Sequence, residues 1–253
     1  MLTIRFAPAD LAKVRFAISP LVEVWQSVRA LQTAAAESLH LPWLVEARVR
    51  VGDLDLSTLR ALQPSRGCSP DFIHPPPAGR LGEFEGELAQ MLATPPERIQ
   101  AEVLQVYGPE VPVVLRPFMD RPDEAVGALA ELLRAYWQQV VDPHWERIRG
   151  VLEGDILYRA RQNADGGAQR LFADVDPSVR FLEDRLQIDK PWDRLVTLKG
   201  RGLLFIPSVF VWPALAVIDE GPWQPTIIYP ARGSALLWDP PRSAPESLAA
   251  LIG

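Results

Sequence analysis

The sequence predicts an α+β protein with long helices in its first two thirds and a mostly antiparallel sheet in its last third. Up to about residue 165, apolar residues recur at the three-and-four spacing of amphipathic helices. From residue 177 onward, short β-prone runs alternate with turn residues instead. Hydrophobic residues make up 48% of the 253 residues, so the chain can bury a sizeable core.

The first elements are a strand and a helix. Residues 2–6 alternate apolar and polar side chains and read as a short strand. Ser19 followed by Pro20 is a favourable helix start, with serine as the N-cap and proline at the first helical position. The apolar residues that follow lie on one helical face, so a helix over residues 20–36 is predicted.

The middle of the chain contains shorter helices and one long loop. Short helices are expected near residue 43 and over residues 55–62. Prolines and glycines interrupt both helical and strand patterns throughout residues 63–83, which therefore read as a surface loop. Helical periodicity returns over residues 82–91 and 95–107.

Two long helices follow in close succession. The first is predicted over residues 122–141 and the second over residues 143–163. Asp142 and Pro143 end one helix and begin the next, while Gly166 and Gly167 close the second. Helices joined by so short a connection should pack as an antiparallel or steeply crossed hairpin.

The last third should form the sheet, and the opening strand should join it to give the α+β body. Turn residues such as Pro213, Gly221-Pro222 and Gly233 separate the β-prone runs. The predicted strands cover residues 179–182, 186–188, 195–198, 203–210, 214–218, 226–229 and 235–238.

Charge and composition exclude several classes of protein. A net charge of −6 argues against this segment gripping a nucleic-acid backbone by itself, because such affinity needs a basic patch. Cys68 is the only cysteine, which rules out an internal disulfide and a thiolate metal cluster within one chain. No secretory signal or membrane span is recognisable, so a cytoplasmic location is expected.

Catalytic motifs are weak in this sequence. His144 and Asp155 share one face of a predicted helix, but two such residues do not make a metal site. An enzyme, a hydrolase or transferase that uses His144 and nearby carboxylates, stays open as an alternative. The same carboxylates, Glu146, Glu153 and Asp155, lie among arginines, and this pattern favours the charged face of a helix over an acid/base pair. No cofactor motif occurs.

Aromatic residues gather in the second half of the chain, as they often do in ligand pockets and at dimer interfaces. They can also simply fill the space between the helices and the sheet. If they line a pocket for a hydrophobic small-molecule effector, the candidate ligand-binding residues are Trp137, Trp145, Arg159, Trp212, Trp223 and Tyr229. An interaction scaffold without any cavity is the third alternative.

Several long motifs resemble those of bacterial ArsR-type transcriptional regulators that carry a large amino-terminal domain of uncharacterised function. The motifs are PSVFVWP at residues 207–213 and PWQPTIIYPARG at residues 222–233. The opening residues 2–6 with Asp10-Leu11, and the stretch 145–161, resemble the same family. The resemblance therefore extends over nearly the whole chain.

This resemblance implies a sensor or dimerisation domain of a regulator. In the family a winged helix-turn-helix follows the large domain. Residues 1–243 would form that large domain, with a helical part over residues 7–165 and a sheet-rich part over residues 177–239. Residues 244–253 look like the lead-in to the winged helix. DNA would then be contacted only through a carboxyl-terminal domain that these residues lack, and a homodimer is expected. The paired cysteines of metal-sensing members are absent, so metal sensing is not implied.

Overall fold

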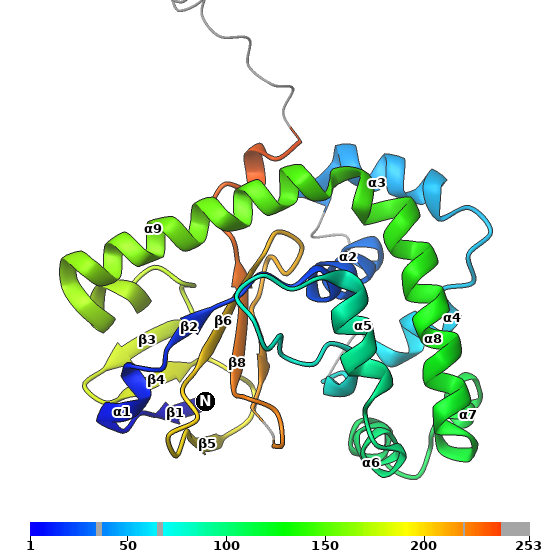
Figure 1. Cartoon of the computed structure of the whole chain (residues 1–253), viewed down its shortest axis with the longest axis horizontal. Coiled ribbons are helices and arrows are strands. Elements are labelled where there is room, and N and C mark those ends of the chain that lie inside the picture. Colours follow the sequence, from blue (N-terminus) through cyan, green and yellow to red (C-terminus); the bar gives the residue numbers. More distant parts are fainter. Residues whose placement is uncertain (34–36, 65–67, 220, 239–253) are drawn as a thin grey trace, which may run out of the picture.

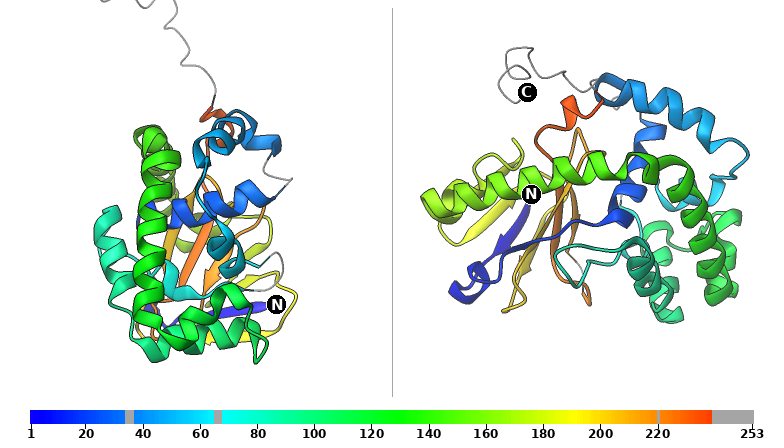
Figure 2. Two further views of the ribbon diagram at one scale, coloured as in Figure 1. Left: turned by 90° about the vertical axis from the view of Figure 1, so that its right-hand side faces the viewer. Right: turned by 45° about the horizontal axis from the view of Figure 1, so that its top comes forward.

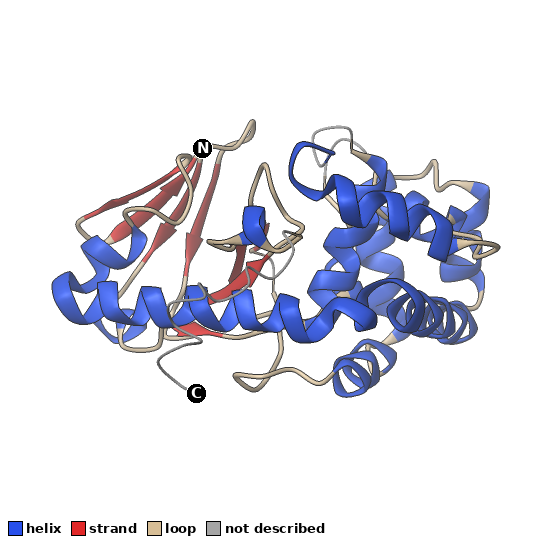
Figure 3. Ribbon diagram, turned by 90° about the horizontal axis from the view of Figure 1, so that it is seen from above, coloured by secondary structure: helices blue, strands red, loops and turns tan. Residues whose placement is uncertain are grey.

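The computed structural model describes residues 1–33, 37–64, 68–219 and 221–238 and confirms the α+β class. Two four-stranded sheets form one half of the molecule and a group of helices forms the other (Figure 1). One long helix, α9 (Trp145–Phe172), extends from the helical half across the sheets (Figures 1 and 3). This helix positions most of the site described below.

The first sheet has the strand order β3-β4-β1-β5, so the opening strand lies inside the carboxyl-terminal sheet as predicted. β1 pairs antiparallel with β4, with Leu2 opposite Ile188, and parallel with β5. Leu2 and Ile4 are fully buried, which agrees with the alternation of the sequence. The strands are β1 (Leu2–Arg5), β3 (Val179–Leu182), β4 (Arg185–Ile188) and β5 (Arg194–Thr197).

The second sheet has the order β2-β6-β8-β7. β6 is parallel to both β2 and β8, and only β7 pairs antiparallel with its neighbour. Every residue of β6 is buried, as expected of a central strand with both faces covered. The strands are β2 (Arg15–Phe16), β6 (Leu204–Ser208), β7 (Ala216–Ile218) and β8 (Thr226–Pro230).

Both sheets are mixed, whereas the sequence suggested mostly antiparallel pairing. The parallel pairs join strands that are not consecutive in the chain, such as β1 with β5 and β2 with β6. Short turns between neighbouring strands indicate antiparallel hairpins, but they carry no information about such distant pairings.

The helical half is assembled around a buried face of α2, which begins at Ser19 and Pro20 as predicted. The Ser19 side chain caps the helix by accepting a hydrogen bond from the Val22 amide at 3.0 Å. Trp25 on α2 is fully buried. The helices of at least five residues in this half are α2 (Pro20–Gln32), α3 (Glu37–Val51), α4 (Ser57–Leu62), α5 (Phe84–Leu92), α6 (Pro96–Tyr107), α7 (Arg116–Asp120) and α8 (Pro122–Tyr136).

α8 and α9 form the predicted steeply crossed pair (Figure 1). Helical turns over residues 137–144 connect them with almost no extended chain. α9 continues beyond the predicted end, but Gly166 and Gly167 interrupt its helical geometry. Gly167 has a φ of +63°, which residues with a side chain rarely adopt, so the glycine pair marks a kink rather than the end of the helix.

One predicted strand is wrong, one strand was missed, and three predictions lie wholly or partly outside the described residues. Residues 235–238 do not form a strand: Gly233 turns the chain with a φ of +87°, and a short 3-10 helix, η6 (Ser234–Leu236), follows. β2 was not predicted, because two residues show no periodicity. The predicted end of the first helix at 34–36, part of the loop at 65–67, and the lead-in at 244–253 lie outside the described residues.

Aromatic rings connect the far end of α9 to the second sheet. The Phe172 ring lies 5.4 Å from that of Phe205 on β6, which lies 6.0 Å from Tyr229 on β8. All three rings are fully buried. Tyr229 therefore stands where the core of the sheets meets α9. None of the described helices is both long and apolar enough to cross a membrane.

Candidate functional site

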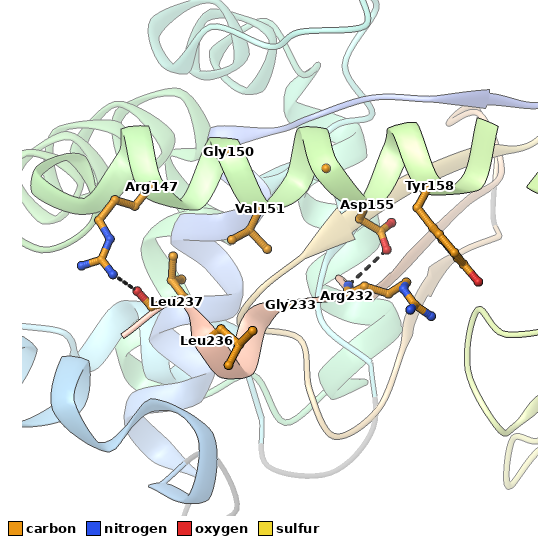
Figure 4. A pocket seen from close by; sticks show the side chains of 10 residues that line it. Arg147, Gly150, Val151, Asp155, Tyr158, Arg232, Gly233, Leu236 and Leu237 are labelled. Carbon is orange, nitrogen blue, oxygen red and sulfur yellow. Dashed lines mark hydrogen bonds between the residues drawn. The ribbon is translucent and has the colours of Figure 1, made fainter. Parts of the chain in front are cut away.

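The first half of α9 carries a hollow on its surface. Gly150 and Gly154 lie one helical turn apart with Val151 beside them, so this face of the helix has little side-chain bulk. A Cβ atom built on either glycine would meet no other atom within 4 Å. The two glycines thus leave open space beside α9 (Figure 4).

The opposite wall of this hollow is the segment that leaves β8, which we call the exit segment (residues 232–238). Together with α9 it encloses an open groove of about 610 Å³. Figure 4 shows Leu236 and Leu237 across the groove from Val151. The wall residues are Arg147, Gly150, Val151, Gly154, Asp155, Tyr158, Arg232, Gly233, Leu236 and Leu237.

Two hydrogen bonds hold the exit segment against α9. The carboxylate of Asp155 accepts a hydrogen bond from the Arg232 amide at 3.1 Å, and the Arg147 guanidinium donates to the Leu237 carbonyl (Figure 4). They lie near opposite ends of the groove. A molecule bound in the groove would therefore touch the exit segment and the helix that fastens it.

Asp155 is also the centre of a buried polar network behind the groove. It is 2% exposed and accepts a hydrogen bond from the Tyr229 hydroxyl, and its carboxylate lies 3.4 Å from Nε of Arg159. The Arg159 guanidinium lies 4.9 Å from the centre of the Tyr229 ring. Burial raises the pKa of Tyr229 well above its usual value and the Asp155 charge adds to this, so the phenol stays protonated and donates.

Asp174 completes this network at the surface. It receives hydrogen bonds from Arg159 at 2.7 Å, from the Tyr158 hydroxyl at 2.8 Å and from Arg232 at 3.2 Å. Burial alone would raise the pKa of Asp174, but these donors together hold it below the usual value. The half-exposed Arg232 guanidinium also lies 4.0 Å from the centre of the Tyr158 ring, so one end of the groove presents an arginine that is paired with Asp174.

An aromatic cluster fixes the far end of the exit segment. The indole of Trp238 donates to Nδ1 of His40 at 2.9 Å and lies edge-on to His144, with ring centres 5.5 Å apart. Burial lowers the pKa of His40 to about 4, although an interaction of the imidazole with the backbone of Val209 acts the other way. The imidazole is therefore neutral at pH 7, which is the form in which Nδ1 can accept this hydrogen bond.

The six predicted ligand-binding residues do not line one cavity. Arg159 and Tyr229 meet in the network behind the groove. Trp137 and Trp145 meet elsewhere, with ring centres 5.3 Å apart, beside a separate hollow of about 420 Å³. Trp212 lies in the loop after β6, and the Trp223 indole donates to Glu102 on α6 at 2.9 Å. The periodicity of a helix shows which residues share one of its faces, but it does not show which residues from other elements pack against that face.

The enzyme alternative requires His144 and nearby carboxylates such as Asp155 to act together, but these two residues contact different partners. His144 lies 3.5 Å from a carboxylate oxygen of Glu46, whereas Asp155 binds Tyr229 and Arg232. Burial lowers the pKa of His144, although the Glu46 charge opposes this shift. No group of three or more histidine, cysteine, aspartate or glutamate side chains within the described part of the chain is arranged to hold a metal ion. The geometry of the groove suits binding.

The groove itself was not predicted. The signal that could have indicated it is the pair Gly150 and Gly154 within an otherwise regular helix, since glycine is unfavourable there unless close packing or open space requires it. Arg232-Gly233, directly after β8, would have been the second signal. Neither signal identifies which segment of the chain forms the opposite wall of the groove.

Comparison with known protein families matches residues 81–235 to a family of unknown function, DUF5937. The chain belongs to this family. The matched stretch includes the glycine face of α9, Asp155, Tyr229 and Arg232, so most of the groove lies within the part shared by DUF5937 proteins. Searches of curated proteins and of solved structures returned no match.

Proposed function

We propose that this chain is the cytoplasmic, ligand-sensing domain of a transcriptional regulator of the ArsR type, in which a winged helix supplies the DNA contacts. The observation that carries the proposal is the shared wall of the groove: the exit segment is one wall and α9 the other. A ligand in the groove changes the contacts of the segment that leads to the carboxyl end of the chain. That is the arrangement a sensor domain needs.

Three further features support this proposal. The motifs of residues 207–213 and 222–233, which resemble ArsR-type regulators, lie in β6, β8 and the loops around them, next to the groove and the aromatic cluster. The net charge of −6 suits a domain that leaves DNA contact to another part of the protein. The groove walls combine apolar side chains with an arginine near each end, which suits an amphipathic small molecule.

Coupling between ligand and output requires that the ligand binds one arrangement of the exit segment more tightly than another. The segment is well suited to have two arrangements. Single hydrogen bonds to Asp155, Arg147, Asp174 and His40 hold it at separate points, and its residue Leu236 is 64% exposed. A coupling free energy of about 1–3 kcal/mol, typical of allosteric proteins, is comparable to the strength of a few such bonds.

The proposal is tested by joining residues 1–253 to a winged helix with a known operator and measuring operator affinity by fluorescence anisotropy. Gly154→Leu fills the groove without a ligand and should change the affinity at least five-fold. Gly127→Leu is the matched control, because Gly127 lies on α8 and also has open space around its Cβ position. Equal affinities for the two fusions would contradict the proposal, as would tight operator binding by residues 1–253 alone.

The homodimer expected from the sequence stays a prediction. Sedimentation of the chain over a range of concentrations measures it directly, and a purely monomeric profile would remove dimerisation from the proposed function.

A further inference from the structure

A second, smaller hollow lies between α2 and the loop that follows β6. One face of α2 contributes Gln26, Arg29, Ala30 and Thr33, which follow the three-and-four spacing of a helix. The loop over residues 210–216 forms the other wall. The hollow has a volume of about 210 Å³, below the roughly 300–1,000 Å³ of pockets for drug-sized ligands. It therefore has room for a small molecule only.

Arg29 brings a positive charge to this hollow. Its side chain is partly buried, and this burial lowers its pKa, although the guanidinium still stays protonated at pH 7. The described residues give this guanidinium neither an ion pair nor a hydrogen-bond acceptor, and Nε in particular is buried without a partner. A buried guanidinium nitrogen without a hydrogen-bond partner is costly, and such groups are rare in folded proteins.

Arg159 shows how the same protein treats a buried arginine that has only a structural task. That guanidinium lies between Asp155 and Asp174, at 3.4 Å and 2.7 Å from their carboxylates. Arg29 has no equivalent carboxylate among the described residues. The contrast leaves the Arg29 guanidinium available to a negatively charged group of a ligand.

The groups around Arg29 do not neutralise it. Burial lowers the pKa of His74 to about 4, and the Arg29 charge contributes to this, so His74 is neutral at pH 7. Burial also lowers the pKa of Lys190; Asp176 and Asp219 oppose this shift and the Arg29 charge adds to it. The ammonium of Lys190 donates to the carbonyl of Leu215, which lines the hollow. Among the residues that line the hollow, Arg29 is therefore the one with a positive charge.

Gln26 provides a second polar group, and it points to a ligand independently of Arg29. It is 2% exposed, lines the hollow, and its Oε1 has no hydrogen-bond partner among the described residues. Buried side-chain amides are normally satisfied. Oε1 is an acceptor, so a carboxylate cannot satisfy it directly; a half turn of the amide group exchanges Oε1 with Nε2 and presents an N–H donor to the hollow instead. In that orientation the amide and the guanidinium together can donate to the two oxygens of a carboxylate, because the guanidinium presents parallel N–H groups.

The remaining walls are apolar and include Phe210, Trp212, Pro213 and Leu215. A single positive charge in such surroundings matches a monovalent anion with an apolar body better than a phosphate of higher charge. We propose that this hollow binds a small monocarboxylic acid, with its carboxylate on Arg29 and Gln26 and its apolar body against Phe210 and Trp212. Trp212, one of the six residues singled out from the sequence, contacts the ligand in this proposal.

Phe210 connects this hollow to the output described above. Its ring centre lies 4.5 Å from that of Trp43 and 6.2 Å from that of Trp238, at the end of the exit segment. A ligand packed against Phe210 would thus touch a residue that lies beside the aromatic cluster at the end of the exit segment. The inference deepens the proposed regulatory function and depends on it for its biological meaning.

The test is a thermal-shift titration of the full chain with sodium benzoate and sodium isovalerate, against sodium chloride of equal ionic strength. We expect a saturable rise in Tm of several degrees with at least one carboxylate. Arg29→Met should abolish the response and also raise the Tm of the ligand-free protein, since it removes a guanidinium nitrogen that is buried without a hydrogen-bond partner. Arg60→Met is the matched control, because Arg60 is exposed on α4, and it should respond like the wild type.

Further variants and probes keep the result decisive. If Arg29→Met fails to fold, Gln26→Leu and Arg29→Lys replace it, and each should weaken the response at least five-fold in apparent Kd. No response of the wild type to either carboxylate, an equal response in the Arg29 variant, or a response to inorganic phosphate alone would overturn the proposal.

Hydrogen exchange separates this proposal from the proposed function. Arg29-dependent carboxylate binding that leaves exchange in residues 232–237 unchanged would support the site and contradict its regulatory role. A shift in operator affinity with Gly154→Leu, together with no carboxylate binding, would support the regulatory role and overturn the site.

Discussion

At the scale of single residues, three arginines near the two hollows differ in what surrounds their charges. Arg159 is fully buried between two carboxylates, and Arg232 shares Asp174 at the surface. Arg29 is partly buried without a carboxylate among the described residues. Sequence alone could not distinguish these environments, because the partners of Arg159 come from separate turns of α9 and from the chain that follows it.

Asp155 should contribute strongly to stability, since Asp155→Ala leaves the buried Tyr229 hydroxyl without its acceptor and Arg159 with Asp174 alone. We expect a loss of about 3–5 kcal/mol in the free energy of unfolding, measured by urea denaturation. Glu153→Ala is the control: Glu153 is half-exposed on the same helix and pairs only with Arg149, so its loss should cost less than about 1 kcal/mol. Similar losses in both variants would contradict the central role of Asp155.

His40 should make the folded state sensitive to acid. Its pKa in the folded protein is lowered to about 4 by burial, so its contribution to stability is complete above the unfolded pKa near 6.5 and is lost as the pH falls toward 4. His40→Asn removes the titration while an amide oxygen can still accept from Trp238. Between pH 6.5 and 4, the wild type should lose about 3 kcal/mol of unfolding free energy relative to the variant.

Urea denaturation of both proteins at several pH values measures this difference. The pH dependence of the wild type alone would not isolate the effect of His40. Burial raises the pKa of Glu23 to about 8, so the contribution of Glu23 to the free energy of unfolding decreases as the pH rises. The two trends offset each other in the wild type between about pH 4.5 and 6.5. A pH-independent difference between wild type and His40→Asn would contradict the assignment.

At the scale of elements, most helices and strands could be predicted, because their periodicity or their turns are local. The helix start at Ser19 and Pro20, the steep connection at residues 137–144 and strands β3 to β5 agree with the sequence within a few residues. The elements that the sequence did not predict depend on contacts with residues far away in the sequence. Phe16 is in a strand because it pairs with Phe205, and residues 235–238 leave the sheet because Gly233 turns them toward α9.

The glycines of α9 should respond to alanine in opposite directions. Gly167 has a positive φ at the kink, so Gly167→Ala should destabilise the protein by about 1–3 kcal/mol. Gly150 is regular helix with open space at its Cβ position, so Gly150→Ala should stabilise it by about 0.5–1 kcal/mol. Thermal denaturation of the two variants measures both effects, and destabilisation by both would show that the groove face of α9 is not open.

At the scale of the whole molecule, α9 and the exit segment tie together parts that are far apart in sequence. α9 crosses from the helical half to the sheets, and the exit segment leaves β8, follows α9 and ends against α3 and the crossing of α8 and α9 (Figure 2). The class of fold follows from the sequence, but this convergence does not. Local patterns record neither which helix face β8 meets nor where the chain turns after Gly233.

The account depends on the claim that occupancy of the groove changes the exit segment. Hydrogen exchange of residues 232–237, followed by mass spectrometry in the full chain, tests this most directly with Gly154→Leu against Gly127→Leu. We predict that Gly154→Leu changes exchange rates in these residues several-fold, while Gly127→Leu leaves them at wild-type values. Identical exchange in the wild type and both variants would contradict the claim.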